Sequence, residues 1–310
     1  MSFRAELLAD RGAAAESEEF FRSRAFYDAE GVTHTLRVHL DGGTIAAPVI
    51  VRGIPGSERR DAISPYGYPG ATVDGDARPD PRAVDWSATG LVSVFLRERV
   101  GGEPCLAGGT ERSMVQVADP ASERKSRMSD RQQIRRNERL GYRIERIEGP
   151  EAGPDRRRAY ADVYDQTMRR AQAEVRYLYG REYWERLLCS PRAWLFLVQA
   201  PDSGTAAGAI AVLSDDIVHY YLSGTADEHL ANSPAKNLIA AVIDFAHELG
   251  VPMNLGGGVR PGDSLEAFKT GFANAELPFR THEVVCDPAA YEELSAGRDD
   301  VGFFPLYRAA

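Results

Sequence analysis

A lysine near the C-terminal end of the chain follows a run of glycines, and these residue types together suit the handling of a negatively charged ligand. The sequence reads NLGGG at 254–258 and SLEAFKTGF at 264–272, which places Phe268 and Lys269 on an expected helix just beyond Gly257 and Gly258. Glycine lets the backbone approach a ligand closely, and an ammonium beside it supplies a compact charge for a developing oxyanion or a terminal phosphate. A solvated helix lysine is the alternative interpretation.

Lysine is rare in this chain, which gives each lysine more weight. Of the 37 basic residues in 310, 34 are arginine and only Lys125, Lys236 and Lys269 are lysine. A coding bias toward arginine explains the general excess. Retention of lysine at position 269 therefore favours a chemical role over a solvated one. Lys236 lies in the expected first turn of a helix, where a cation is mildly unfavourable, so a polar contact is possible there.

The arginines are concentrated in one stretch of an otherwise acidic protein. The formal net charge of −9 excludes a general nucleic-acid-binding coat, but residues 123–146 carry nine basic against four acidic side chains. Four arginines lie on an expected helix over 127–140, with Ser129 or Asp130 as its cap and Gly141 as its stop: Arg131, Arg135, Arg136 and Arg139. Such a strip suits contacts to RNA phosphates, although a solvated helix face is the common alternative.

The pattern of elements predicts an α/β fold. Two strands over 33–52 are joined at Asp41-Gly42, a strong hairpin signal, and a helix is expected over 84–100. From 193 the pattern gives a strand, a hairpin, a helix, a strand, a helix and a strand, which is typical of a mixed sheet flanked by helices. The expected elements there are 193–200, 206–213, 217–224, 233–249 (capped by Ser233), 251–255, 264–271 and 280–286.

This order, with SPYGYPGA at 64–71, HYYLSGT at 219–225 and the two segments around Lys269, resembles the FemABX-type aminoacyltransferases. The resemblance implies two tandem GNAT-like domains, each a mixed, mostly antiparallel sheet flanked by helices. We expect the first over 1–150, completed by the tail 287–310, and the second over 151–286. It also implies an enzyme that uses aminoacyl-tRNA as donor and forms an amide with an acceptor amine. The acceptor stays open between a small peptide, an antibiotic-like intermediate and a peptidoglycan precursor.

The resemblance assigns roles to particular residues. Lys269, with Phe268, would lie at the reacting end of the donor and stabilise the oxyanion, with Gly257 and Gly258 lining the site. Tyrosines and one arginine would contact the acceptor: Tyr66, Tyr68, Arg176, Tyr179, Tyr220 and Tyr221. His219 is a possible base, although a lone strand histidine is more often structural. We expect no metal and no cofactor other than the aminoacyl-tRNA co-substrate.

Two other functions compete with this hypothesis. A GNAT N-acyltransferase would use acyl-CoA or an acyl carrier protein, but the expected pyrophosphate-binding segment 227–237 contains no glycine, and Pro234 lacks an N–H donor. A non-catalytic protein that binds RNA or a partner is the third possibility. Three scattered cysteines, a charged N-terminal segment and the lack of a long apolar run favour a cytoplasmic protein without membrane insertion. The sequence does not indicate an oligomeric state.

Overall fold

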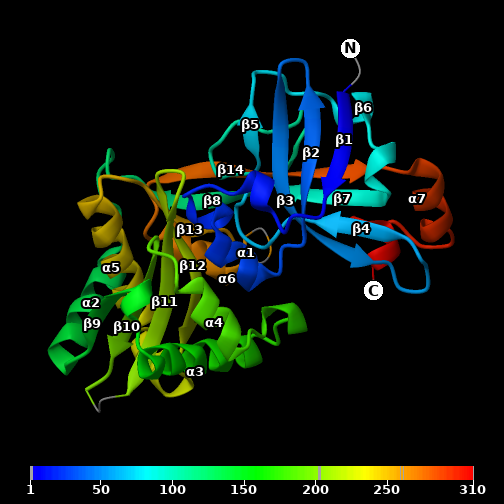
Figure 1. Cartoon of the computed structure of the whole chain (residues 1–310). Helices are drawn as coiled ribbons and strands as arrows, with labels where there is room; N and C mark the ends of the chain where they lie inside the picture. Colours follow the sequence, from blue (N-terminus) through cyan, green and yellow to red (C-terminus); the bar gives the residue numbers. More distant parts are fainter. Residues whose placement is uncertain (1–2, 202–203, 259, 261, 310) are drawn as a thin grey trace. The chain divides into compact units, whose positions relative to one another are not determined.

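The chain folds into two compact units (Figure 1). The computed structural model describes residues 3–201, 204–258, 260 and 262–309. Unit 1 comprises residues 1–113 and 278–310, and unit 2 comprises residues 114–277. The boundary expected at 150 therefore falls after Ser113 instead. Residues 114–150 belong to unit 2 because their strands pair with strands of that unit. Within the described residues, no helix combines the length and apolar character that crossing a bilayer requires.

Unit 1 is built on a mixed sheet in the order β6-β1-β2-β3-β4-β7-β14, and β5 also pairs with β3. The β1–β6 and β4–β7 pairs are parallel, and the other pairs are antiparallel. The strands are β1 (Phe3–Leu8), β2 (His34–Leu40), β3 (Gly43–Gly53), β4 (Arg60–Ile63), β5 (Thr72–Asp74), β6 (Val84–Asp85), β7 (Leu91–Arg97) and β14 (Ala275–Val285). Its helices are α1 (Arg24–Glu30) and α7 (Pro288–Ser295), with short 3-10 turns at Ala13–Ala15, Phe20–Arg22, Pro81–Ala83, Ser87–Thr89 and Leu306–Arg308.

The hairpin expected over 33–52 is confirmed as β2 and β3, but the helix expected over 84–100 is wrong. That segment forms β6, a 3-10 turn and β7. Val92, Val94 and Leu96 are all buried, and β7 lies between β4 and β14. Strand pairing on both sides therefore overrides the helical spacing of the apolar residues.

The C-terminal tail is held in unit 1 by a buried carboxylate. Asp61 is fully buried on β4 and accepts a hydrogen bond from the Tyr307 hydroxyl at 3.2 Å. The Arg308 guanidinium also pairs with Asp61, at 2.5 Å and 3.0 Å. Tyr307 further bonds the Ser93 hydroxyl at 2.7 Å. These contacts compensate the charge of Asp61 and fix the tail on the sheet.

Unit 2 is built on the sheet order β8-β13-β12-β11-β10-β9, in which only the β12–β13 pair is parallel. The strands are β8 (Thr110–Ala118), which begins in unit 1, β9 (Arg143–Glu148), β10 (Ala193–Gln199), β11 (Thr205–Ser214), β12 (Ile217–Thr225) and β13 (Met253–Gly256). The helices are α2 (Met128–Leu140), α3 (Pro154–Arg170), α4 (Arg181–Leu187), α5 (Ala235–Glu248) and α6 (Ser264–Thr270), with 3-10 turns at Gly149–Glu151, Val175–Tyr177 and Asp227–Asn232.

Helices cover both faces of the unit 2 sheet (Figure 1). Ala209 and Ala211 of β11 share a buried cluster with the apolar face of α5. Gly208 points the other way, where an added Cβ would lie 2.8 Å from the Tyr160 ring of α3. Since successive strand residues face opposite sides, α5 and α3 pack on opposite faces. The small residues of β11 allow both helices to approach closely.

Two expected helix caps are wrong, although the helices themselves are confirmed. α2 begins after Arg127, and neither Ser129 nor Asp130 is its N-cap residue. α5 begins after Pro234, while Ser233 adopts a left-handed φ of 44° and its hydroxyl bonds the Leu230 carbonyl at 3.4 Å. Gly141 does end α2, with a φ of 96°.

Candidate functional site

The loop after β13 is shaped by a side chain of the strand itself. Asn254 Oδ1 accepts a hydrogen bond from the Gly256 N–H at 2.7 Å, which turns the chain as the strand ends. Gly256 has a φ of 79°, a conformation that favours glycine. Gly258 packs against the cap of α6, since an added Cβ would lie 2.5 Å from Asp263 Oδ1. The glycines therefore allow the loop to fold closely onto the start of α6.

Lys269 of α6 reaches back to this loop. Its Nζ donates to the Gly257 carbonyl at 2.7 Å, and the described residues offer it no second hydrogen-bond acceptor. Burial lowers the pKa of Lys269 to about 8, opposed by the negative charge of Asp263. Asp263 is itself the N-cap, accepting from the Glu266 N–H at 2.8 Å. The ammonium is thus positioned by one carbonyl and retains N–H donors for another acceptor.

Phe268 points toward the core rather than toward the loop. It packs against the buried cluster of unit 2 and contacts the Phe272 ring edge-on at 5.7 Å. The two neighbouring side chains therefore point in different directions: Phe268 packs α6 against the core, and Lys269 faces the glycine loop. A direct catalytic part for Phe268 stays a prediction.

His219 of β12 contacts Asn254, the residue that holds this loop. It is buried and lies opposite Asn254, with Nδ1 of His219 3.0 Å from Nδ2 of Asn254. The other ring nitrogen contacts the Ser214 carbonyl at 3.4 Å. Burial lowers the pKa of His219 to about 4. A neutral imidazole with both nitrogens engaged orients Asn254 and is a poor general base, which favours the structural interpretation of this residue.

β12 and β13 pair over a very short stretch. Only Val218 with Met253 and His219 with Asn254 are in register, and then the two strands part. Tyr220 follows immediately, packs against the core cluster, and has a pKa that burial raises to about 12. Tyr221 is an extra residue in β12, because Ala211 pairs with Tyr220 and Ile210 with Leu222. Tyr220 and Tyr221 therefore lie on β12, the strand next to β13, and β13 leads directly into the glycine loop.

The other proposed acceptor residues lie elsewhere. Arg176 is exposed, paired with Glu174 at 2.7 Å. Tyr179 stacks on the Tyr183 ring at 3.8 Å and lines a separate pocket of about 280 Å³ between α3 and α4. Tyr66 and Tyr68 lie in unit 1, where Tyr66 is exposed and Tyr68 packs edge-on against Phe21 and Phe279. Their acceptor roles stay predictions.

The basic strip borders a groove of about 750 Å³ in unit 2. Arg131 and Arg135 line it, together with two arginines that the sequence analysis did not single out, Arg124 and Arg143. Arg136 and Arg139 are exposed on α2. Arg124 pairs with Asp244, but no acidic partner of Arg131, Arg135 or Arg143 lies among the described residues. The acidic residues Glu138 and Asp244 also line the groove, and its apolar lining comprises Ile134, Tyr142, Val198, Ala241 and Phe272.

The first turn of α5 carries its own ion pair. Lys236 Nζ lies 2.9 Å from Asp130 Oδ1, and Asp130 is buried. The second carboxylate oxygen of Asp130 faces Gly271 just after α6, where an added Cβ would lie 3.2 Å away. From the sequence, Asp130 is expected only as a helix cap. Its helical spacing with Ile134 and Asn137, which places all three on one face of α2, is the sequence signal for an inward-facing carboxylate. The polar contact expected for Lys236 is therefore made to a protein carboxylate.

These features agree with a comparison against known families. Residues 124–269 match the sequence model of the acetyltransferase (GNAT) domain. Unit 2 has a GNAT-like fold. A search of curated proteins found no match.

Solved structures extend the likeness to both units. The crystal structure of FemX aligns with a TM-score of 0.55 and 12% identity, covering 84% of this chain and 89% of that one. The C-terminal domain of a putative lysylphosphatidylglycerol synthetase from Agrobacterium fabrum aligns with a TM-score of 0.53 and 13% identity, over 91% and 90%. The structure of L-PGS from Bacillus licheniformis aligns with a TM-score of 0.52 and 11% identity, covering 78% of this chain and 81% of that one. At this identity the likeness shows the fold, and the expected mixed α/β, GNAT-like architecture is confirmed.

Proposed function

We propose that the protein is an acyltransferase whose donor is aminoacyl-tRNA and whose product is an amide on an acceptor amine. The observation that carries the proposal is the Lys269 ammonium, held 2.7 Å from the Gly257 carbonyl in a GNAT-like unit. The likeness to FemX and to lysylphosphatidylglycerol synthetase folds supports acyl or aminoacyl transfer in general. Lys269 belongs to the segment that resembles the FemABX-type enzymes.

The reaction needs positioning and charge stabilisation more than a protein base. The acceptor nitrogen attacks the ester carbonyl carbon, a C–N bond forms, and the carbonyl electron pair moves onto oxygen. Lys269 donates a hydrogen bond to that oxyanion. When the intermediate collapses, the ester C–O bond breaks, and the departing ribose oxygen takes the amine proton through the neighbouring ribose hydroxyl. The engaged, low-pKa His219 is consistent with a reaction that uses no histidine base.

The start of α5 supports a donor other than CoA. A pyrophosphate at a helix N-terminus needs free backbone N–H groups. Here Pro234 has none, and the Lys236 N–H bonds the Ser233 carbonyl at 3.0 Å. The Lys236 ammonium at this helix start is already paired with the buried Asp130 carboxylate at 2.9 Å, so its charge is largely neutralised before any phosphate arrives.

The arginine-lined groove supports a donor that carries its phosphates on RNA. Arg131, Arg135 and Arg143 have no acidic partner among the described residues, so their charges are available to an external anion. Phosphate contacts of this kind position a nucleic acid without reading its sequence.

An acyl-CoA or acyl-carrier-protein N-acyltransferase is the second candidate, favoured by the family match over 124–269. The experiment compares amide formation from a charged tRNA pool with that from acyl-CoA and acyl carrier protein, using a panel of amines. Product that requires charged tRNA and disappears after RNase treatment supports the proposal. Product that survives RNase and requires a thioester overturns it. No product with any donor, from folded protein that still binds tRNA, supports the non-catalytic alternative.

A further inference from the structure

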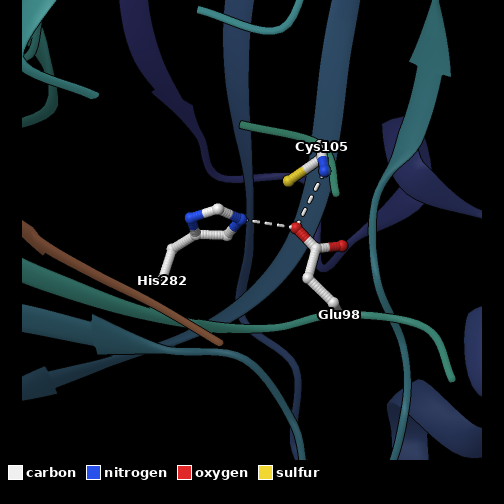
Figure 2. Close-up of side chains that lie close together, drawn as sticks. All are labelled: Glu98, Cys105 and His282. Carbon is white, nitrogen blue, oxygen red and sulfur yellow. Dashed lines mark hydrogen bonds and ion pairs between the residues drawn. The ribbon is translucent and has the colours of Figure 1, made fainter. Parts of the chain in front are cut away.

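Three buried side chains of unit 1 converge from distant parts of the sequence (Figure 2). Glu98 follows β7, Cys105 lies in the loop after it, and His282 lies on β14. β7 and β14 are antiparallel, with Leu96 opposite His282. Glu98, two residues further along, therefore faces the same side of the sheet as His282. The loop then folds back and carries Cys105 over both.

The potential ligand atoms of this cluster lie close together. His282 Nε2 is 2.7 Å from Glu98 Oε1, and one nitrogen or oxygen or sulfur atom from each residue lies within 4.8 Å of the others. Figure 2 shows the Cys105 sulfur directed toward the Glu98–His282 contact. Each of the three residues is no more than 4% exposed. The contact between Glu98 and His282 offsets the cost of burying the carboxylate and the imidazole, and a bound cation would compensate the carboxylate and a Cys105 thiolate together.

We propose that Glu98, Cys105 and His282 bind a Zn²⁺ ion. A thiolate, an imidazole and a carboxylate are the donor types of zinc sites, and the sulfur and nitrogen donors disfavour Mg²⁺ and Ca²⁺. Zinc bonds sulfur at ~2.3 Å and nitrogen or oxygen at ~2.0–2.2 Å, so small side-chain rotations bring all three atoms onto one ion. The charges balance, because a thiolate and a carboxylate neutralise the dication. On binding, the thiol proton leaves to solvent and the imidazole proton resides on Nδ1.

The surroundings suit such a site. The Cys105 N–H donates to Glu98 Oε1 at 2.8 Å, which orients the carboxylate as an outer hydrogen bond does in metal centres. Gly109 lies against the imidazole, where an added Cβ would be 3.0 Å from His282 Cε1, so the backbone confines the ring. A pocket of about 230 Å³ is lined by Glu98 and Cys105, together with Glu103 and two arginines, Arg78 and Arg99. A fourth zinc position therefore faces a space that water or a small ligand can enter.

The test measures metal directly. Purified protein is loaded with Zn²⁺, desalted and analysed for metal content, and a second sample is loaded with Co²⁺ and examined by absorption spectroscopy. We expect about one zinc per chain, and a near-ultraviolet thiolate-to-cobalt band with the visible bands of a four-coordinate ion. Cys105→Ser should abolish the thiolate band, and Glu98→Gln and His282→Gln should each lower zinc affinity at least tenfold. Cys189→Ser, at an exposed cysteine outside the cluster, should retain both signals.

Two results would overturn the proposal. One is folded wild-type protein that retains less than about a tenth of an equivalent of zinc and shows no cobalt–thiolate band. The other is a thiolate band that persists in Cys105→Ser and is lost in Cys189→Ser. If the cluster variants fail to fold, Cys189→Ser decides the point: a band that it retains supports the cluster, and a band that it loses overturns the proposal. The readout is independent of the proposed transferase activity.

Discussion

Lys269 and Gly257 are joined by a 2.7 Å hydrogen bond from the ammonium to the backbone carbonyl. The two residues belong to different segments, α6 and the loop after β13. Their contact fixes the position of the charge, while burial brings the pKa of Lys269 down to about 8. A cation held in this way can stabilise an oxyanion without reorganising during the reaction.

Replacing Lys269 with methionine should lower kcat by roughly a hundredfold to a thousandfold, with a much smaller change in KM, because the missing interaction forms mainly in the transition state. Steady-state kinetics with the active donor measure this. Thr270→Val, at the neighbouring position of α6, is the control and should keep most of the activity. A Lys269→Met enzyme at near wild-type rate would exclude the oxyanion role.

The pH dependence of the rate should report the same group. Lys269 acts as a cation in the proposed step, so kcat should decline as the pH rises through about 8, where the ammonium loses its proton. In Lys269→Arg any remaining rate should lack this decline, since arginine stays protonated. A wild-type rate that instead increases through pH 8 would indicate that the neutral amine acts, as a base or nucleophile.

Gly258→Ala should damage the site without touching Lys269. The new Cβ would lie 2.5 Å from Asp263 Oδ1 and 2.9 Å from the Arg260 carbonyl, so either the loop or the α6 cap must move. We expect a loss of about 1–3 kcal/mol in the free energy of unfolding and a reduced kcat. Gly53→Ala, where an added Cβ meets nothing within 4 Å, is the comparison. Equal free energies of unfolding for the two variants, measured by denaturant titration, would contradict the close packing of Gly258 against Asp263.

His219 should make stability depend on acid. Its folded-state pKa of about 4 lies below the ordinary value of 6.5, so the unfolded chain binds a proton that the folded chain does not. The free energy of unfolding therefore decreases as the pH falls below 6.5. This decrease is complete near pH 4 and amounts to roughly 3 kcal/mol. His219→Gln should flatten this part of the stability profile, as measured by denaturant unfolding at several pH values. A variant as acid-sensitive as the wild type would show that other groups dominate.

The groove arginines should govern the salt dependence of tRNA binding. Removing one arginine–phosphate interaction reduces the slope of log K against log salt by about 0.9 for a duplex stem, so Arg135→Ala with Arg143→Ala should reduce it by roughly 2. Arg186→Ala removes an arginine that pairs with Glu182 within α4 and should leave the slope unchanged. Fluorescence anisotropy over a salt series measures both. Identical slopes in the double variant and the control would place the RNA elsewhere.

The sequence by itself determined much of unit 2, because the relevant signals are local. Glycine stops and apolar periodicity depend on neighbouring residues, and they located α2, α5, α6 and the β11–β12 hairpin closely. The helical spacing over 84–100 predicted a helix wrongly because the structure of that segment depends on distant residues. Both edges of β7 pair with strands that lie far away in the chain.

Only the tertiary structure decided what each candidate side chain contacts. The sequence singled out Lys269 by its rarity and its glycine neighbours, but the contact to Gly257 depends on how the loop folds back onto α6. Likewise, nothing in the spacing of residues 98, 105 and 282 indicates a ligand set, because strand pairing between β7 and β14 brings them together across the sheet. Local propensity acts over a few residues, whereas sites are assembled by long-range packing.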